Sequence, residues 1–179
     1  MKKCLLLLFV AVLVAAMAGP VGASKGNPEK ELPFKGVFSG ELLGFNEDAE
    51  DIEDRCDSPE TTWAVTSFEG WGTATHLGRT YVYAEHCSYT TNGVPDGTYG
   101  EGKLTMVAAN GDILYGTYTG GVSLSGPPVI GFMDDFTFVD GGTGRFAFAS
   151  SGGTEVGSVD VTDNSFNVRM EGSIAYSNS

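Results

Sequence analysis

The sequence is poor in basic residues. It holds 10 lysines and arginines against 23 aspartates and glutamates, and its formal net charge at pH 7 is −13. A surface with this excess of negative charge repels the phosphates of nucleic acids and the headgroups of anionic membranes. The charge balance therefore excludes nucleic acid as a partner and leaves small molecules or cationic proteins.

The sequence also lacks an apolar run long enough to span a membrane. Its longest run, Cys4–Ala18, falls short of the roughly 20 apolar residues that a membrane-spanning helix needs. Lys2 and Lys3 precede this run, and Val21-Gly22-Ala23 follows it with small residues at the −3 and −1 positions. This pattern is typical of a cleaved signal peptide over residues 1–23. We therefore expect a secreted or periplasmic protein with no membrane span.

Cysteine and histidine are scarce, with three and two copies. Cys56 and Cys87 remain after cleavage of the signal peptide, and an even pair in an oxidising compartment most simply forms one disulfide. The alternative is a metal site, but no C-x-x-C or H-x-x-x-H spacing supports it. We predict a Cys56–Cys87 disulfide, no metal and no cofactor.

Motifs of catalysis are missing as well. There is no G-x-S-x-G elbow, and the glycines of Gly141–Gly144 precede an expected strand, whereas a dinucleotide loop precedes a helix. Asp134 and Asp135 are adjacent, but neighbours on a strand point to opposite faces and would not share a site. The sequence therefore predicts no catalytic residue, and a non-enzymatic role is favoured.

An acidic run occupies residues 47–57. Carboxylates are the preferred ligands of Ca²⁺, but this run fits no EF-hand spacing and has no turn glycine. We expect a solvated loop held in place by Cys56, with calcium binding as the alternative.

What the sequence does have is a period-two alternation of apolar residues. Leu104, Met106 and Ala108 share one face of an expected strand, and the last strand keeps one apolar face from Phe166 to Tyr176. Asn110-Gly111 between two alternating runs predicts a hairpin with a type I′ turn. Gly141–Gly144 is expected to turn the chain into a strand over Arg145–Ala149.

The segments add up to an all-β domain over residues 34–177, preceded by a short linker over residues 24–33. About eight or nine strands follow one another with mostly short turns, and many of the 26 glycines lie within strands. Glycine in strands fits the sharp coiling of a small barrel. An up-and-down antiparallel β-barrel is therefore expected. A β-sandwich is the alternative, and an open sheet would leave long exposed edges.

Three short stretches carry a family resemblance. Gly141–Phe146, followed by Phe148-Ala149 and Gly152-Gly153, resembles the late hairpin of dirigent proteins, which belong to the allene oxide cyclase-like barrels. Gly72–Arg79 and Ala108–Asp112 resemble segments of secreted bacterial proteins of unknown activity that share this barrel.

The resemblance implies an eight-stranded antiparallel barrel with a central cavity. In plants such barrels cyclise an oxylipin or guide the coupling of phenoxy radicals. This chain departs from the dirigent pattern, because Ser150 and Ser151 stand where one residue is usual. The acidic and basic cavity residues of those enzymes have no matching positions here, so no catalytic residue is carried over.

Aromatic residues are plentiful, and a small barrel is either filled by its side chains or holds one small ligand. The candidate ligand-binding residues are His76, Arg79, Trp63, Trp71 and Tyr81. His76 would act as a hydrogen-bond donor or general base at the barrel mouth, and Arg79 would attract an anionic ligand. The favoured alternative is structural, with His76 bonded to a backbone carbonyl and Arg79 paired with a carboxylate.

Together these observations predict a secreted barrel protein that binds a small hydrophobic ligand in its lumen. A cofactor-free isomerase or cyclase acting on an oxidised lipid or phenolic, with His76 and Arg79 in the site, is one alternative. An extracellular interaction protein that uses its acidic surface is another. The sequence indicates neither the ligand nor the oligomeric state.

Overall fold

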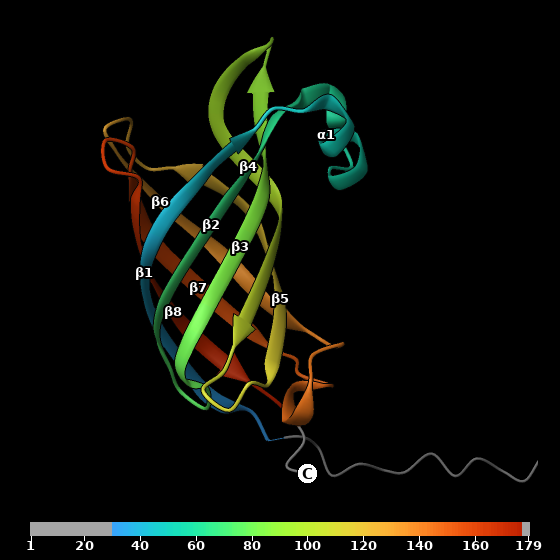
Figure 1. The fold of residues 1–179 in the computed structure, drawn as a ribbon, viewed down its shortest axis with the longest axis vertical. Helices are drawn as coiled ribbons and strands as arrows, with labels where there is room; N and C mark the ends of the chain where they lie inside the picture. Colours follow the sequence, from blue (N-terminus) through green and yellow to red (C-terminus); the bar gives the residue numbers. More distant parts are fainter. Residues whose placement is uncertain (1–29, 177–179) are drawn as a thin grey trace, which may run out of the picture.

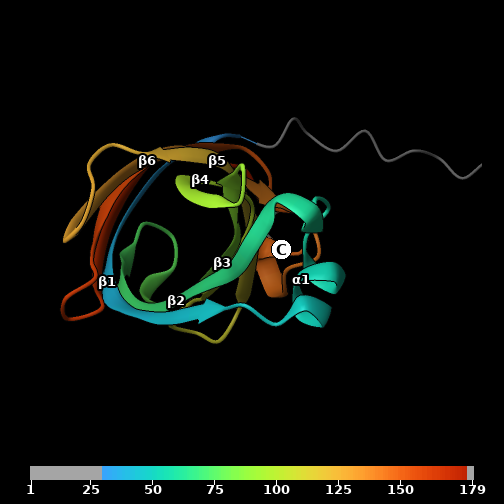
Figure 2. The ribbon, with the colours of Figure 1, turned by 90° about the horizontal axis from the view of Figure 1, so that it is seen from above.

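Eight strands form one closed barrel in the computed structural model, which describes residues 30–176 (Figures 1 and 2). Each strand pairs antiparallel with the next along the chain. The strands are β1 (Leu32–Asn46), β2 (Thr62–Ala74), β3 (Gly78–Thr91), β4 (Val94–Val107), β5 (Ile113–Ser123), β6 (Val129–Val139), β7 (Gly152–Asp160) and β8 (Ser165–Ile174). The all-β, eight-stranded up-and-down barrel is thus confirmed. The signal peptide predicted over residues 1–23 lies outside the described residues, as does most of the linker.

Pairing of β1 with β8 closes the sheet. The register runs from Leu32 opposite Ile174 to Glu41 opposite Ser165. Because the first and last strands pair, the barrel has no free edge, unlike the sandwich and the open sheet considered above. The inward-facing residues of all eight strands therefore meet in one interior.

One end of the barrel is filled by side chains. This closed end carries the β2–β3 and β4–β5 turns and the 3₁₀ helix η2 (Gly144–Phe146), at the bottom of Figure 1. Its core consists of fully buried residues, among them Phe34, Met106, Leu114, Phe136, Phe138, Phe146 and Ile174. Phe34 packs edge-on against Phe138 at 4.8 Å and against Phe136 at 5.9 Å between ring centroids. The alternation predicted for these strands places the apolar residues inward.

The opposite end carries α1 (Ala49–Arg55), the β3–β4 hairpin and the β5–β6 and β7–β8 loops. In Figure 1 the β3–β4 hairpin rises above the rim, and in Figure 2 α1 lies outside the ring of strands. We call this the open end. Neither α1 nor any other helix in residues 30–176 has the length and apolar character to cross a bilayer.

The solvated loop expected over the acidic run is a helix instead. The Asp48 side chain caps α1 by accepting from the backbone N–H groups of Glu50 and Asp51, at 3.0 and 3.4 Å. Acidic residues in the first turn and Arg55 in the last turn match the helix dipole. Capping and the helix dipole therefore stabilise a helix here, although the segment has no apolar stripe.

Two predictions about turns are wrong in detail. The hairpin at Asn110-Gly111 forms, but only Gly111 has a positive φ (87°), so the turn is not type I′. The type I′ geometry occurs at Asn92-Gly93, where φ is 53° and 76°. Arg145–Ala149 is not a strand, because η2 spans Gly144–Phe146 and β7 begins at Gly152.

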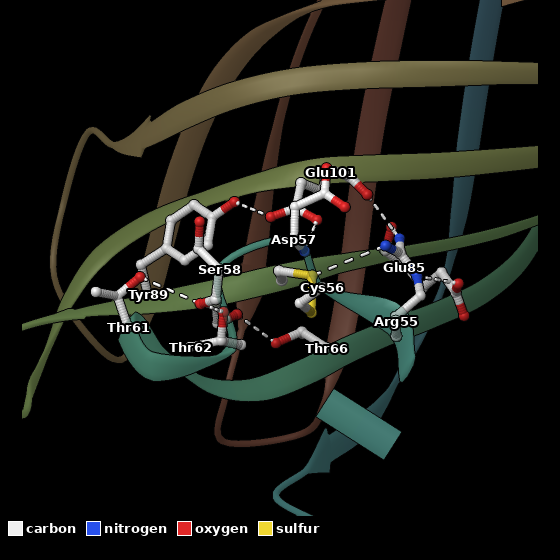
Figure 3. The surroundings of a disulfide bond; sticks show 12 residues. Arg55, Cys56, Asp57, Ser58, Thr61, Thr62, Thr66, Glu85, Tyr89 and Glu101 are labelled. Carbon is white, nitrogen blue, oxygen red and sulfur yellow. Dashed lines mark hydrogen bonds and ion pairs between the residues drawn. A yellow bond between two sulfur atoms is a disulfide. The ribbon is translucent and has the colours of Figure 1, made fainter. Parts of the chain in front are cut away.

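A second, small core lies on the outer face beneath α1. Ile52, Cys56, Val65 and Cys87 are buried together there, and the predicted Cys56–Cys87 disulfide is present (Figure 3). Arg55 fixes the end of the helix by an ion pair with Glu85, at 2.6 Å between Nε and Oε1. The disulfide thus joins the β1–β2 connection to β3 near the open end.

Removal of the disulfide is expected to destabilise the barrel. The sequence separation of 31 residues gives a loop whose closure is worth roughly 3–4 kcal/mol in the chain-entropy account. The double variant Cys56→Ser/Cys87→Ser should lose about that free energy of unfolding in urea titrations under oxidising conditions. The wild type in excess reductant is the matched control and should unfold at the same urea concentration as the variant. An unchanged midpoint in both would contradict the assignment.

Candidate functional site

The open half of the barrel holds a cavity of about 920 Å³. Its floor is formed where Phe38, Leu104 and Met170 cover the closed-end core. Phe45 and Trp63 stack on each other at the mouth, with ring centroids 5.1 Å apart. The volume lies in the range of pockets that enclose one small ligand.

One wall of this lumen is apolar. It is built by inward-facing residues of β1, β7 and β8, the strands on either side of the closure, and the lining residues are Phe38, Leu42, Val159, Phe166, Val168 and Met170. Phe68 from β2 extends this wall and packs edge-on against Phe166 at 5.7 Å. This wall therefore suits the apolar part of a ligand.

The other wall carries a group of buried polar side chains. We call it the polar cluster, and its members, one each from β3 to β7, are His86, Tyr99, Tyr118, Asp134 and Glu155. The Tyr99 hydroxyl donates to Asp134 Oδ2 at 2.5 Å, and His86 Nδ1 lies 3.1 Å from the Tyr118 hydroxyl. His86 also stacks on Tyr99, with centroids 4.4 Å apart. The lumen therefore combines a mainly apolar lining with one buried polar cluster.

A glycine allows the bond between Tyr99 and Asp134 to form. Tyr99 lies on β4 and Asp134 on β6, so the tyrosine ring must cross β5. The register of β5 against β6 slips at Gly120-Gly121, and a Cβ atom at Gly121 would overlap the Tyr99 hydroxyl. Absence of a side chain at this position is what opens the path to Asp134.

Asp134 and Glu155 form a carboxyl pair. They are direct partners in the β6–β7 register, and both are buried. Burial raises the pKa of Asp134, and burial followed by hydrogen-bonding interaction with Asp134 raises the pKa of Glu155 well above its ordinary value. Two carboxyl groups this close tend to share a proton, because ionising both would place two negative charges side by side. The pair therefore favours holding a proton, with the larger rise in pKa at Glu155, while the hydrogen bond from Tyr99 stabilises the charged form of Asp134.

His86 is neutral in this environment. Burial, and next the positive charge of Arg55, lower its pKa to about 3. A neutral imidazole has one donor and one acceptor nitrogen, so it either accepts from Tyr118 or donates to it. Neither His86 nor its partners bring a positive charge into the lumen.

Of the candidate binding residues, only Trp63 lines the lumen. His76 lies in the β2–β3 turn at the closed end with a φ of 69°, and its Nε2 is 3.0 Å from the Pro33 carbonyl oxygen. Its Nδ1 lies 3.2 Å from the Tyr176 hydroxyl, and its carbonyl accepts from Arg145. This is the structural role that sequence analysis favoured for a histidine.

Arg79, Trp71 and Tyr81 lie on the outer face of the barrel. The Arg79 guanidinium sits 4.8 Å from the Trp71 ring centroid, whereas a carboxylate partner was expected. Tyr81 donates to Glu69 at 2.7 Å, and this bond raises the tyrosine pKa to about 12. A lumen ligand would reach none of the three, and the cyclase hypothesis loses the two residues on which it was based.

Sequence analysis did not identify the residues of the polar cluster as site residues. One signal was available, because Asp134 falls on the same alternating face as Phe132, Phe136 and Phe138. An acid on an apolar face marks a buried carboxyl. Its partner Glu155 became visible only with the register of β6 against β7.

The described residues bring one set of metal-ligating atoms together. Cys56, Cys87 and Glu101 have ligand atoms within 4.8 Å of one another, but the two sulfurs are bonded to each other and offer no thiolate. In the acidic run, Asp48 is engaged in capping α1, and Asp51 accepts from Asn46. The residues of 30–176 therefore form no evident cation site.

Replacement of His86 should change how stability depends on pH. The folded pKa of about 3 lies below the ordinary 6.5, so the unfolded chain binds more protons and the wild type loses stability as pH falls from 6.5 toward 3. His86→Gln keeps a hydrogen-bonding group for Tyr118 and removes the titration. Between pH 6 and 4 its free energy of unfolding should fall less steeply than that of the wild type, by up to about 1.4 kcal/mol per pH unit. Parallel curves would show that His86 titrates normally.

Gly121→Ala tests the path of Tyr99. The added methyl should displace the hydroxyl from Asp134, leave a buried carboxylate without its donor, and cost about 1–3 kcal/mol of unfolding free energy. Gly120→Ala is the matched control, because a Cβ there meets only the Tyr99 carbonyl oxygen at 3.6 Å. Thermal or chemical unfolding of both variants measures the difference. Equal effects at the two positions would rule out the close approach.

Comparison of the chain with protein-family models, with curated proteins and with solved structures finds no match. The resemblance of the Gly141–Phe146 segment to dirigent barrels therefore stays a prediction. The geometry and chemistry of the lumen are the remaining guide to function.

Proposed function

We propose that this protein binds a small hydrophobic ligand in the open half of its barrel. The observation that carries the proposal is the cavity of about 920 Å³ above a packed floor. A barrel of eight strands can be filled completely by its own side chains, as the closed end is here. The open half is instead lined mainly by apolar residues with a few polar groups on one side, the composition typical of ligand pockets.

The proposal includes secretion or a periplasmic location. Disulfides form and persist in oxidising compartments, and Cys56–Cys87 is buried beneath α1. The pattern of residues 1–23 supports the same location. Binding in such a compartment would concern a compound met outside the cytosol.

A cofactor-free isomerase or cyclase is the second candidate, and the carboxyl pair is the observation in its favour. A buried carboxyl pair that holds a proton offers a proton donor and a proton acceptor at one place in the lumen wall. This version agrees with the proposed relation to the allene oxide cyclase-like barrels, but it rests on different residues from His76 and Arg79. An interaction protein gains no specific support from residues 30–176.

A bulky residue in the lumen should abolish ligand binding. Val168 lines the cavity on β8, whereas Val156 on the adjacent β7 is 50% exposed on the outer face. Val168→Trp should weaken binding of the neutral fluorescent probe N-phenyl-1-naphthylamine at least about tenfold, which is 1.4 kcal/mol. Val156→Trp makes the same exchange outside and should leave binding unchanged.

Organic extraction of the purified protein, followed by mass spectrometry, looks for the natural ligand. Failure of the wild type to bind the probe, together with empty extracts, would overturn the proposed function. Equal binding by the two tryptophan variants would place the probe outside the lumen.

A further inference from the structure

The lumen carries acidic side chains and no cationic ones. Among the residues that line it are Asp134 and Glu155 in the wall and Asp96 at the mouth, but no lysine or arginine. Its single histidine, His86, is neutral. Arg55, whose charge acts on His86, is held outside the barrel by Glu85 and the Glu101 carbonyl. A ligand in this lumen therefore meets negative charge only.

The carboxyl pair is also incompletely satisfied. Asp134 is 8% exposed, and its Oδ2 accepts from Tyr99. Its second oxygen, Oδ1, is buried and has no hydrogen bond of normal geometry within residues 30–176. Buried carboxylates normally have every lone pair satisfied, because the cost of desolvation is otherwise uncompensated. Glu155, whose side chain interacts with Asp134, is the neighbouring donor within the pair, and a ligand that donates to Asp134 would add to it.

The two walls of the lumen define the shape of such a ligand. Phe38, Phe166 and Met170 offer an apolar surface on β1 and β8, and the carboxyl pair lies on β6 and β7, where Glu155 is the direct neighbour of Met170. A molecule that satisfies both has an apolar body and a polar group that donates hydrogen bonds. A carboxylate head would instead be placed beside Asp134 with no cation to offset it.

We infer that the lumen selects apolar molecules that bear a protonated amine and rejects those that bear a carboxylate. The amine donates to Asp134 and pairs with its charge, while the apolar body lies along the β1–β8 wall. Opposite charges in a site shielded from water attract strongly, and like charges there repel strongly. This inference rests on the proposed function, since it names the ligand class of the same lumen.

The test is displacement of N-phenyl-1-naphthylamine by dodecylamine, dodecanol and dodecanoate. The three have equal chain lengths and differ in the charge of the head, and each is used below its micelle concentration at pH 7. High ionic strength screens attraction of the amine to the acidic outer surface. Dodecylamine should bind at least about tenfold more tightly than dodecanoate, with dodecanol between them.

Asp134→Asn removes the charge from the lumen and should abolish the preference for the amine. Asp135→Asn is the matched control, because Asp135 is the next residue on β6 and is exposed on the outer face. It should keep the preference. Val168→Trp, which should not retain the probe, shows whether the probe that the amine displaces from the wild type lies in the lumen.

Several outcomes would overturn the inference. These are equal or tighter binding of dodecanoate, a preference that survives in Asp134→Asn, and failure of the amine to displace a bound probe. The ranking in the wild type decides the question even if Asp134→Asn does not fold. If the probe does not bind and the organic extracts are empty, the proposed function fails instead, so the two failures are distinguishable.

Discussion

Closure of the sheet by β1 and β8 is the constraint on which the rest of the molecule depends. Once these strands pair, each strand has one face toward a common interior, and the alternation of the sequence decides what fills it. At the closed end, phenylalanines from β1 and β6 pack together with aliphatic residues of the other strands. At the open end the same pattern supplies too little side-chain volume, so a cavity remains. The lumen is thus a consequence of closure combined with uneven filling.

The polar cluster is costly for the fold. Removing carboxyl groups from water carries a free-energy penalty that a single tyrosine hydrogen bond does not repay in full. Burial keeps His86 in its neutral form. Position 121 must be a glycine, because a Cβ there would overlap the Tyr99 hydroxyl that reaches Asp134. An apolar set of residues would fill the wall more cheaply. Groups of this kind persist at sites where function needs them, which is why the cluster is the centre of the functional argument.

Much of the fold followed from the sequence, because strand alternation and turn residues are local signals, and a sheet of this many strands keeps exposed edges unless the first strand pairs with the last. Leu104, Met106 and Phe166 face inward as their period predicts, and the disulfide joins the even pair of cysteines that remains after the predicted signal peptide. The site did not follow. Asp134 was weighed against its chain neighbour Asp135, whereas its partner Glu155 lies across a strand register that the sequence does not specify. His76 and Arg79 were candidates because histidine and arginine often bind ligands. His76 instead lies in a turn, and Arg79 packs on Trp71 at the outer face of the barrel.

The most direct measurement of the central claim is a crystal structure of the protein under xenon pressure. Xenon enters apolar cavities that side chains leave empty. The account predicts xenon in the open half, between the β1–β8 wall and the polar cluster, and none among the phenylalanines of the closed end. A lumen filled by side chains from end to end, with no bound xenon, would contradict it.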